Sequence, residues 1–293
     1  MDDRRWTRRD LITRTGIGST LLAATTASSP NDVHDLKRTM HIGIVTYNVA
    51  KDWTLEQILT NCKAAAIEGV EFRTTHKHGV EPSMTSAQRK EVRQKCADSG
   101  LLQISLGSIC EFQSPDPAVV RQNIETCKEF VLLAKDLGAR GVKVRPNGLP
   151  KDGAEEKTLE QIGRSLNECG KIGADNGVEI WMEVHGGGTQ NPPNARKIMD
   201  HCGHPSVGIT WNSNSTDVLQ GSVKPAFDLL GKFIRCCHIN DLWGSYPYRE
   251  LFTLLNETGY DRFTLCEVGA SIQPEDGVTF LKCYRGLWNE LSR

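Results

Sequence analysis

The chain has 293 residues, of which 38% are hydrophobic and 24% charged, and its formal net charge at pH 7 is −1. This length suits one large domain with a sizeable core, and the composition is typical of a soluble globular protein. The first 27 residues carry five Arg and three Asp, so the rest of the chain is slightly more acidic. A weakly acidic body argues against nucleic acid as a partner, because phosphate binding requires a basic face.

The first segment of the chain has the order of an export signal. Residues 7–12, Thr-Arg-Arg-Asp-Leu-Ile, precede a weakly apolar run over 15–27 that is rich in Gly, Ala and Thr. Arg8 and Arg9 resemble the pair of a bacterial twin-arginine signal, which directs proteins across the membrane. We therefore expect a signal peptide over 1–27, a linker over 28–40, and a periplasmic or exported protein. The apolar run is too short to span a membrane, so no membrane insertion is expected after cleavage. A basic tail without a targeting role is the alternative.

Ten cysteines are scattered along the chain without a Cys-x-x-Cys pair. Several fall inside helical or strand patterns, where a free thiol behaves as a small apolar residue. Disulfide frameworks are typical of short secreted chains, which this is not. We therefore expect few or no disulfides.

From residue 41 onward, apolar runs typical of strands alternate with amphipathic segments typical of helices. The expected strands cover residues 41–47, 69–73, 102–106, 141–144, 178–183, 207–211, 233–239 and 263–266. The expected helices cover residues 54–66, 86–99, 117–137, 155–176, 193–202, 223–230, 248–258 and 276–291. Eight such β-α units in about 250 residues predict a (β/α)8 TIM barrel over residues 41–293. An open doubly wound sheet is the alternative, but no Gly-x-Gly-x-x-Gly motif follows the first strand.

Polar residues mark the ends of the expected strands, where reacting groups lie in a barrel of this kind. They are Glu71, Arg73, Lys143, Arg145, Glu183, His185, Asn212, His238 and Glu267. Glu183 and His185 are two residues apart in a strand, so both can face one space. The glycines at 186–188 then allow a sharp turn. Two carboxylates, an amide and an imidazole on four consecutive strands predict a site for Mg²⁺, Mn²⁺, Co²⁺ or Zn²⁺.

Four motifs resemble the signatures of the sugar phosphate isomerase/epimerase superfamily, the xylose-isomerase-like barrels. They are Met-Glu-Val-His-Gly-Gly at 182–187, Trp-Asn-Ser-Asn at 211–214, Cys-His-Ile-Asn-Asp at 237–241 and Cys-Glu-Val-Gly at 266–269. The resemblance extends from about residue 41 to about residue 290. Members of that superfamily bind one divalent metal with Glu, Asp, His and Glu from strands five to eight. The resemblance therefore implies that the metal ligands of this chain are Glu183, Asn212, His238 and Glu267.

Asn212 departs from the superfamily pattern, which normally has Asp at this position. Asn can ligate through its carbonyl oxygen but brings no charge, so the protein ligands would carry about −2 rather than about −3. Ser215 and Gly244 stand where epimerases of the superfamily carry a His and, in some, an Arg. These differences count against a simple ketose 3-epimerase.

A site of this kind supports proton transfer on a sugar. A divalent ion held by Glu183 and Glu267 can polarise a carbonyl and stabilise the enediolate, and the two carboxylates can act as base and acid. His185 can hydrogen-bond a substrate oxygen or, equally, orient Glu183. Lys143 and Arg145 can meet an anionic or hydroxylated group, with a solvated rim as the alternative.

Trp243, in an expected β-α loop, is a candidate wall of the substrate pocket. The first interpretation of the whole sequence is a metal-dependent isomerase or epimerase of a sugar or sugar-like polyol. A lyase or dehydratase on the same site is the second, and a carbohydrate-binding pseudoenzyme, motivated by Asn212, is the third. The expected partner is a small carbohydrate, and a homo-oligomer is compatible with the sequence.

Overall fold

In the computed structural model, which describes residues 39–151 and 155–293, eight parallel strands close into a barrel in the order β1 to β8. The strands are β1 His41–Val45, β2 Gly69–Arg73, β3 Gln103–Glu111, β4 Gly141–Arg145, β5 Glu179–Glu183, β6 Val207–Asn212, β7 Ile234–Ile239 and β8 Phe263–Cys266. β1 pairs with both β2 and β8 and so closes the ring. The (β/α)8 prediction is confirmed, and the expected signal peptide lies outside the described residues.

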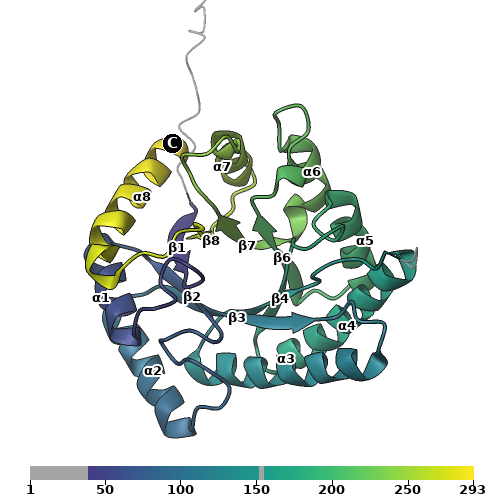
Figure 1. Cartoon of the computed structure of the whole chain (residues 1–293), viewed down its shortest axis with the longest axis horizontal. Coiled ribbons are helices and arrows are strands. Elements are labelled where there is room, and N and C mark those ends of the chain that lie inside the picture. The colour runs from purple at the N-terminus through teal and green to yellow at the C-terminus, as the bar shows by residue number, and fades with distance from the viewer. Residues whose placement is uncertain (1–38, 152–154) are drawn as a thin grey trace, which may run out of the picture. The chain divides into compact units, whose positions relative to one another are not determined.

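Helices alternate with the strands and form the outer ring of the barrel, as Figure 1 shows. They are α1 Leu55–Ala65, α2 Ser86–Ser99, α3 Pro117–Leu137, α4 Glu155–Asp175, α5 Pro192–Cys202, α6 Lys224–Leu230, α7 Tyr248–Glu257 and α8 Gly277–Leu291. The short 3-10 turns are η1 Ser215–Asp217, η2 Gly231–Phe233 and η3 Pro274–Asp276. None of the helices among the described residues is both long and apolar enough to cross a membrane.

Local sequence signals set the ends of several helices. Thr54 and Gln57 form a capping box at α1, in which each side chain accepts a hydrogen bond from the other's backbone N–H. Asp116 accepts from the backbone at the start of α3, directly before Pro117. Gly138 ends the same helix with φ +72°, a left-handed conformation that glycine adopts without strain. These signals explain why the predicted bounds of α1 and α3 agree closely with the structure.

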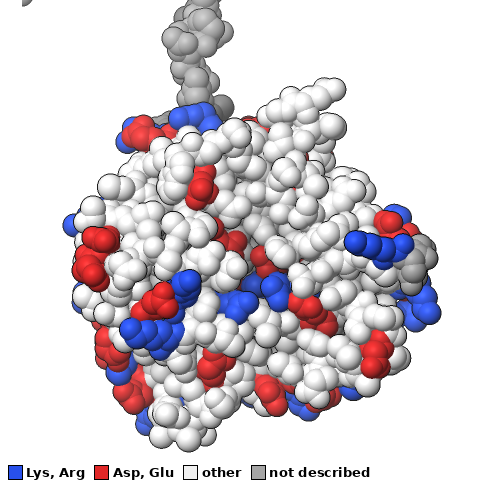
Figure 2. All heavy atoms as spheres, in the orientation of Figure 1, with Lys and Arg blue, Asp and Glu red and all other residues white. Residues whose placement is uncertain are grey.

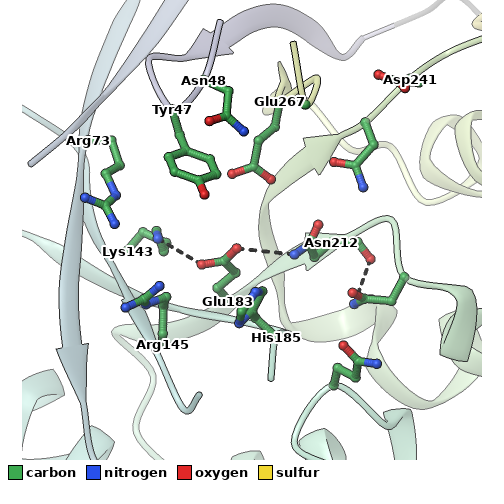
Figure 3. A pocket seen from close by; sticks show the side chains of 14 residues that line it. Tyr47, Asn48, Arg73, Lys143, Arg145, Glu183, His185, Asn212, Asp241 and Glu267 are labelled. Carbon is green, nitrogen blue, oxygen red and sulfur yellow. Dashed lines mark hydrogen bonds and ion pairs between the residues drawn. The ribbon is translucent and has the colours of Figure 1, made fainter. Parts of the chain in front are cut away.

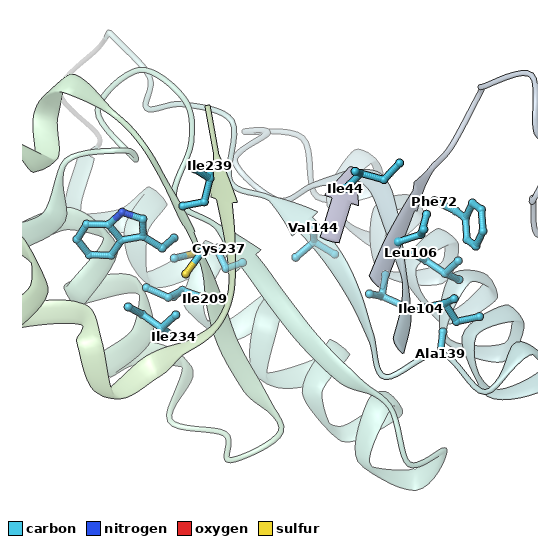
Figure 4. Packing of buried hydrophobic residues seen from close by; sticks show 14 of the residues in the cluster. Ile44, Phe72, Ile104, Leu106, Ala139, Val144, Ile209, Ile234, Cys237 and Ile239 are labelled. Atoms are coloured by element: carbon cyan, nitrogen blue, oxygen red, sulfur yellow. The ribbon is translucent and has the colours of Figure 1, made fainter. Parts of the chain in front are cut away.

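Apolar side chains fill the space between the strands and the surrounding helices, as Figure 4 shows for Ile44, Phe72 and Leu106. A second, smaller cluster is separate from this layer and consists of Val45, Trp181, Cys236, Phe263 and Leu265. Trp181 packs against Gly141 of the neighbouring strand, where an added Cβ would lie 2.4 Å from the indole ring. Glycine at 141 therefore makes room for the Trp181 side chain.

Charged residues hold the amino ends of the strands together. The indole N–H of Trp181 donates to Glu179 at 2.7 Å, and Glu179 forms an ion pair with Arg262, which stacks over the Trp181 ring. Glu179 begins β5, whereas Glu183 ends it. The two ends of one strand thus have different tasks: the amino end stabilises the barrel, and the carboxyl end is left for a site.

Nine of the ten cysteines are buried, and only Cys283 is exposed. All ten are free thiols. Their burial agrees with the interpretation of these thiols as small apolar core residues.

Strand β3 is longer than the sequence predicts, since it runs over Gln103–Glu111 instead of ending at residue 106. Its register with β4 shifts between Gly107 and Glu111. Within the shifted stretch, the Ser108 hydroxyl donates to the backbone oxygen of Lys143 at 2.7 Å. A side-chain hydrogen bond thus satisfies a carbonyl beside this irregularity, which strand propensity alone does not reveal.

Candidate functional site

A pocket of about 470 Å³ lies at the carboxyl ends of the strands. It is lined by Tyr47, Asn48, Arg73, Lys143, Arg145, Glu183, His185, Gln190, Asn212, Asn214, Asn240, Asp241, Glu267 and Gly269. Figure 2 shows that side chains of both charge signs meet in the hollow at the centre of this face, and Figure 3 draws the lining side chains. The strand-end residues of β2, β4, β5 and β6 thus share one cavity.

Glu183, His238 and Glu267 form the centre of the site. Nδ1 of His238 lies 3.3 Å from Oε2 of Glu267 and 3.6 Å from Oε1 of Glu183. His238 is fully buried, and the Glu267 side chain is 13% exposed toward the pocket that it lines. The barrel therefore brings together three of the four residues that the sequence proposes as metal ligands, from β5, β7 and the residue after β8.

The second ring nitrogen of His238 contacts Glu71, a strand-end carboxylate whose role could not be predicted from the sequence. Nε2 lies 3.3 Å from Oε2 of Glu71, and both side chains are fully buried. Such a contact places the proton on Nε2 and leaves Nδ1 for a metal. Gly107 makes room for Glu71, because an added Cβ there would lie 2.7 Å from Oε1. Cys236 is close by, but burial raises the pKa of its thiol well above the usual range, so it is neutral.

The charges at this centre are strongly coupled. Burial disfavours the charged form of His238, but the carboxylates of Glu267 and Glu71 outweigh it and raise the His238 pKa well above its ordinary value. Burial would also raise the pKa of Glu183, yet Lys143 and His238 hold that pKa well below its usual range. Protein groups alone therefore favour ionised Glu183 beside an imidazolium. A divalent cation held by His238 would compete with this proton, so its binding would be coupled to proton release.

The donor atoms fit a divalent cation. One atom each from Glu183, His238 and Glu267 lies within 4.8 Å of the others. Nδ1 of His238 is buried and has no hydrogen-bond partner among the described residues. Two carboxylate oxygens and one imidazole nitrogen are ligands that Zn²⁺, Mn²⁺ and Co²⁺ accept.

Asn212 lies beside this centre, where its side-chain N–H donates to Oε1 of Glu183 at 3.2 Å. Its own backbone oxygen accepts from Asn214, whose side chain also bonds the Val184 carbonyl at 2.7 Å. Figure 3 shows the Asn212 amide facing Glu183 across the pocket floor. The fourth strand-end residue therefore reaches the site as a hydrogen-bond donor to a carboxylate, and its ligation of a metal through oxygen stays a prediction.

His185 lines the pocket directly after β5. Its Nδ1 is buried without a hydrogen-bond partner, and no hydrogen bond joins its ring to Glu183 among the described residues. Gly186 and Gly188 follow with φ +94° and +82°, so the expected sharp turn is present. The structure therefore shows no orienting contact from His185 to Glu183 among the described residues, and a hydrogen bond from His185 to a substrate stays a prediction.

Lys143 and Arg145 also line the pocket, but each has an acidic partner. Nζ of Lys143 lies 2.8 Å from Oε2 of Glu183, and Arg145 lies 2.7 Å from Glu111. Trp243 is 60% exposed and is not among the lining residues, so the structure does not place it at the pocket wall.

Several further lining residues received no specific role from the sequence. They include Arg73, which the sequence marks only as a strand-end residue, and Asn48, Gln190, Asn214, Asn240, Asp241 and Gly269. Asn214 and Asp241 belong to the motifs quoted above, and Arg73 ends β2. The positions of these three residues in a motif or at a strand end could therefore have identified them as pocket residues. Asn48 and Gln190 lie in loops after strands, and no sequence motif marks them.

A buried carboxylate supports the loop that follows β6. Asp217 accepts from the backbone N–H of Asn214 at 2.9 Å and from the Tyr246 hydroxyl at 3.0 Å. Tyr246 in turn accepts from the indole N–H of Trp211. Burial raises the pKa of Asp217 from 3.8 to about 7. This network ties the loop after β6, which contains Asn214, to the loop after β7, which contains Tyr246.

Because its pKa is raised on folding, Asp217 binds more protons in the folded state than in the unfolded state. Its contribution to stability is present below about pH 4 and is lost as the pH rises to about 7. We expect Asp217→Asn to remove this loss, so that the variant gains on the order of 4 kcal/mol relative to wild type between these pH values. Urea unfolding at pH 4, 5.5 and 7 measures the difference, and a constant difference across the series contradicts it.

The model of the xylose isomerase-like TIM barrel family matches residues 59–282. The chain belongs to this family. The matched residues contain β2 to β8, and with them the whole Glu71–Glu183–His238–Glu267 arrangement. Among curated proteins, no sequence matches the chain.

Solved structures share the fold of this xylose isomerase-like barrel at low sequence identity. An L-ribulose 3-epimerase is 17% identical with a TM-score of 0.72, covering 86% of this chain and 94% of its own. An IolI protein with a bound zinc atom is 17% identical with a TM-score of 0.70, covering 86% and 98%. The 3-keto-D-glucoside 4-epimerase YcjR from E. coli is 14% identical with a TM-score of 0.67, covering 86% and 98%.

Proposed function

We propose that this chain is a divalent-metal-dependent isomerase or epimerase of a sugar or sugar-like polyol, acting by proton transfer through an enediolate. The observation that carries the proposal is the convergence of Glu183, His238 and Glu267 at the mouth of the barrel. Membership of the xylose isomerase-like family supports it. Further support comes from similar structures, which are named as sugar epimerases and, in one case, hold zinc.

A divalent cation, when bound, supplies the positive charge that polarises the substrate carbonyl and stabilises the enediolate. Glu183 and Glu267 reach the centre from β5 and from beyond β8, so they approach a bound sugar from different sides. Lys143 keeps Glu183 ionised and therefore able to accept the proton from carbon. Glu267, which is open to the pocket, takes up a proton from solvent and delivers it to the enediolate, and exchange with solvent then returns Glu183 to its ionised form. His185 binds a substrate oxygen.

The proposal is tested by assaying the full chain with Mn²⁺ or Co²⁺ against a panel of ketoses, inososes and keto-glycosides. We expect turnover of at least one sugar, loss of that turnover with EDTA, and its return when metal is added back. A product that has lost water indicates a lyase instead. Carbohydrate binding without turnover, at full metal occupancy, indicates a binding protein and contradicts the proposal.

Changing His238 to Ala should remove the metal and its stabilising effect together. A cation present at 100-fold its Kd stabilises the folded state by about 2.7 kcal/mol, so the metal-induced rise in Tm should disappear in the variant. Metal content by mass spectrometry and Tm with and without Mn²⁺ provide the measurements. His201→Ala, on the exposed end of α5, is the matched control. Unchanged stoichiometry in His238→Ala rules out the assignment.

Changing Asn212 to Asp should tighten metal binding by about tenfold or more, because it adds a charge next to a dication. Turnover at metal saturation should not improve, since the added charge weakens the pull of the cation on the substrate carbonyl. Calorimetric titration of Mn²⁺ and steady-state kinetics measure the two effects. A gain in both would mean that Asn212 marks a decayed site. Identical metal affinity would show that residue 212 does not reach the metal.

A further inference from the structure

The cationic residues of the pocket gather on one wall. Arg73 ends β2, and Lys143 and Arg145 lie on β4. Figure 3 shows these three side chains on one side of the cavity, with Asn212 and Asp241 on the other. The pocket therefore has a basic side at β2 and β4 and a carboxylate-rich side toward β7 and β8.

Arg73 differs from the other two cations in its partners. Lys143 is paired with Glu183, and Arg145 with Glu111. Arg73 instead donates to the Thr74 carbonyl at 2.9 Å and the Thr75 hydroxyl at 3.1 Å, and no carboxylate lies within ion-pair distance of it in the described parts of the chain. Its charge is thus not balanced by a direct contact.

The surroundings of Arg73 make this unbalanced charge unfavourable. Its guanidinium lies over the Tyr47 ring, 5.4 Å from the centroid. Burial, and then the charge of Arg145, lower the pKa of Arg73. The Nε of Arg145 is itself buried without a hydrogen-bond partner. Two guanidinium groups thus line the same side of the pocket, and one of them has no ion-pair partner among the described residues. Such a pair suits a planar or tetrahedral oxyanion, which arginine binds through several N–H groups at once.

We propose that Arg73 and Arg145 form an oxyanion subsite, and that the substrate is a sugar bearing a carboxylate or phosphate group. The identity of the substrate rests on the proposed function, which sets the reacting carbonyl near Glu183 and Glu267. The anionic group then lies at the β2–β4 wall, away from Asp241. A substrate bound in this direction has one end at each of the two charged sides of the pocket.

The test is calorimetric titration of the Mn²⁺-loaded full chain with D-fructose, D-fructuronate and D-fructose 6-phosphate. We expect at least one anionic ligand to bind about tenfold more tightly than D-fructose, with the advantage shrinking as NaCl rises from about 50 to about 500 mM. The anionic ligand with the larger gain in affinity over D-fructose identifies the preferred group as carboxylate or phosphate. Arg73→Gln should lower the affinity for the anionic ligands much more than the affinity for D-fructose and so remove the advantage, whereas Arg73→Lys should keep part of the advantage. Arg164→Gln, on the exposed face of α4, is the control.

Equal affinity for all three ligands, or an advantage that persists in Arg73→Gln, overturns the subsite. Deuterium exchange with each ligand separates this outcome from failure of the proposed function. Deuterium exchange on D-fructose without any preference for anionic ligands supports the proposed isomerase function and rejects the subsite. An Arg73-dependent preference without exchange on any ligand keeps the subsite and rejects the isomerase.

Discussion

Replacing Glu183 by Gln is expected to lower kcat/KM by about 10³-fold or more, because the change removes both a metal ligand and the base that takes the proton. Gln has nearly the same size and can still accept from Asn212. It also leaves Lys143 buried without its carboxylate, so a loss of stability is expected beside the catalytic loss. Metal affinity should fall in the same variant. Steady-state kinetics on a sugar identified by the panel, and calorimetric titration of Mn²⁺, measure the two losses.

Glu179→Gln is the matched control, because Glu179 is the carboxylate at the opposite end of the same strand. It bonds Trp181 and Arg262, far from the pocket. This variant should lose stability but keep its metal affinity and its kcat/KM at low temperature. Equal catalytic losses in the two variants would mean that the Glu183 effect is only structural.

Replacing Lys143 by Met is expected to destabilise the metal-free protein by about 3 kcal/mol, because it leaves Glu183 buried without its cation. Both side chains of this ion pair are only 5% exposed. The imidazolium of His238 and the amide of Asn212 remain near Glu183, which places the expected cost at the lower end for a broken buried pair. Urea unfolding in EDTA measures it.

Added Mn²⁺ should recover part of the stability lost in Lys143→Met, since a dication beside Glu183 supplies the missing positive charge. Lys171→Met, at an exposed position on α4, should change the free energy of unfolding by less than about 0.5 kcal/mol. An identical deficit for Lys143→Met with and without Mn²⁺ would show that no metal binds next to Glu183.

The barrel itself could be predicted from the sequence because its signals are local. Apolar runs alternate with helical periods, and caps such as Thr54 and Gly138 fix the helix ends. The length of β3 could not be predicted, since its continuation past Gly107 depends on pairing with β4 and on the Ser108 hydrogen bond. Such pairing is set by tertiary structure, to which strand propensity is only a weak guide.

The centre of the site could also be predicted, because a parallel barrel places every strand end at one mouth. This rule was sufficient to bring Glu183, His238 and Glu267 together. It does not tell which strand-end residues pair with one another. The Glu71–His238 contact joins positions 167 residues apart, and the Lys143–Glu183 pair turns an expected substrate contact into an internal ion pair. Loop residues such as Trp243 follow no periodic rule, so their position could not be derived from the sequence.

The most direct test of the proposed chemistry is hydrogen exchange between substrate carbon and solvent. The full chain is incubated in D2O with Mn²⁺ and each sugar of the panel. The mass of the recovered sugar is then measured by mass spectrometry. We predict that one sugar gains a single carbon-bound deuterium without loss of water, and that EDTA or Glu183→Gln blocks the gain. A metal-loaded protein that binds its sugar but transfers no deuterium, or exchange that persists in EDTA, would contradict an enediolate mechanism at Glu183, His238 and Glu267.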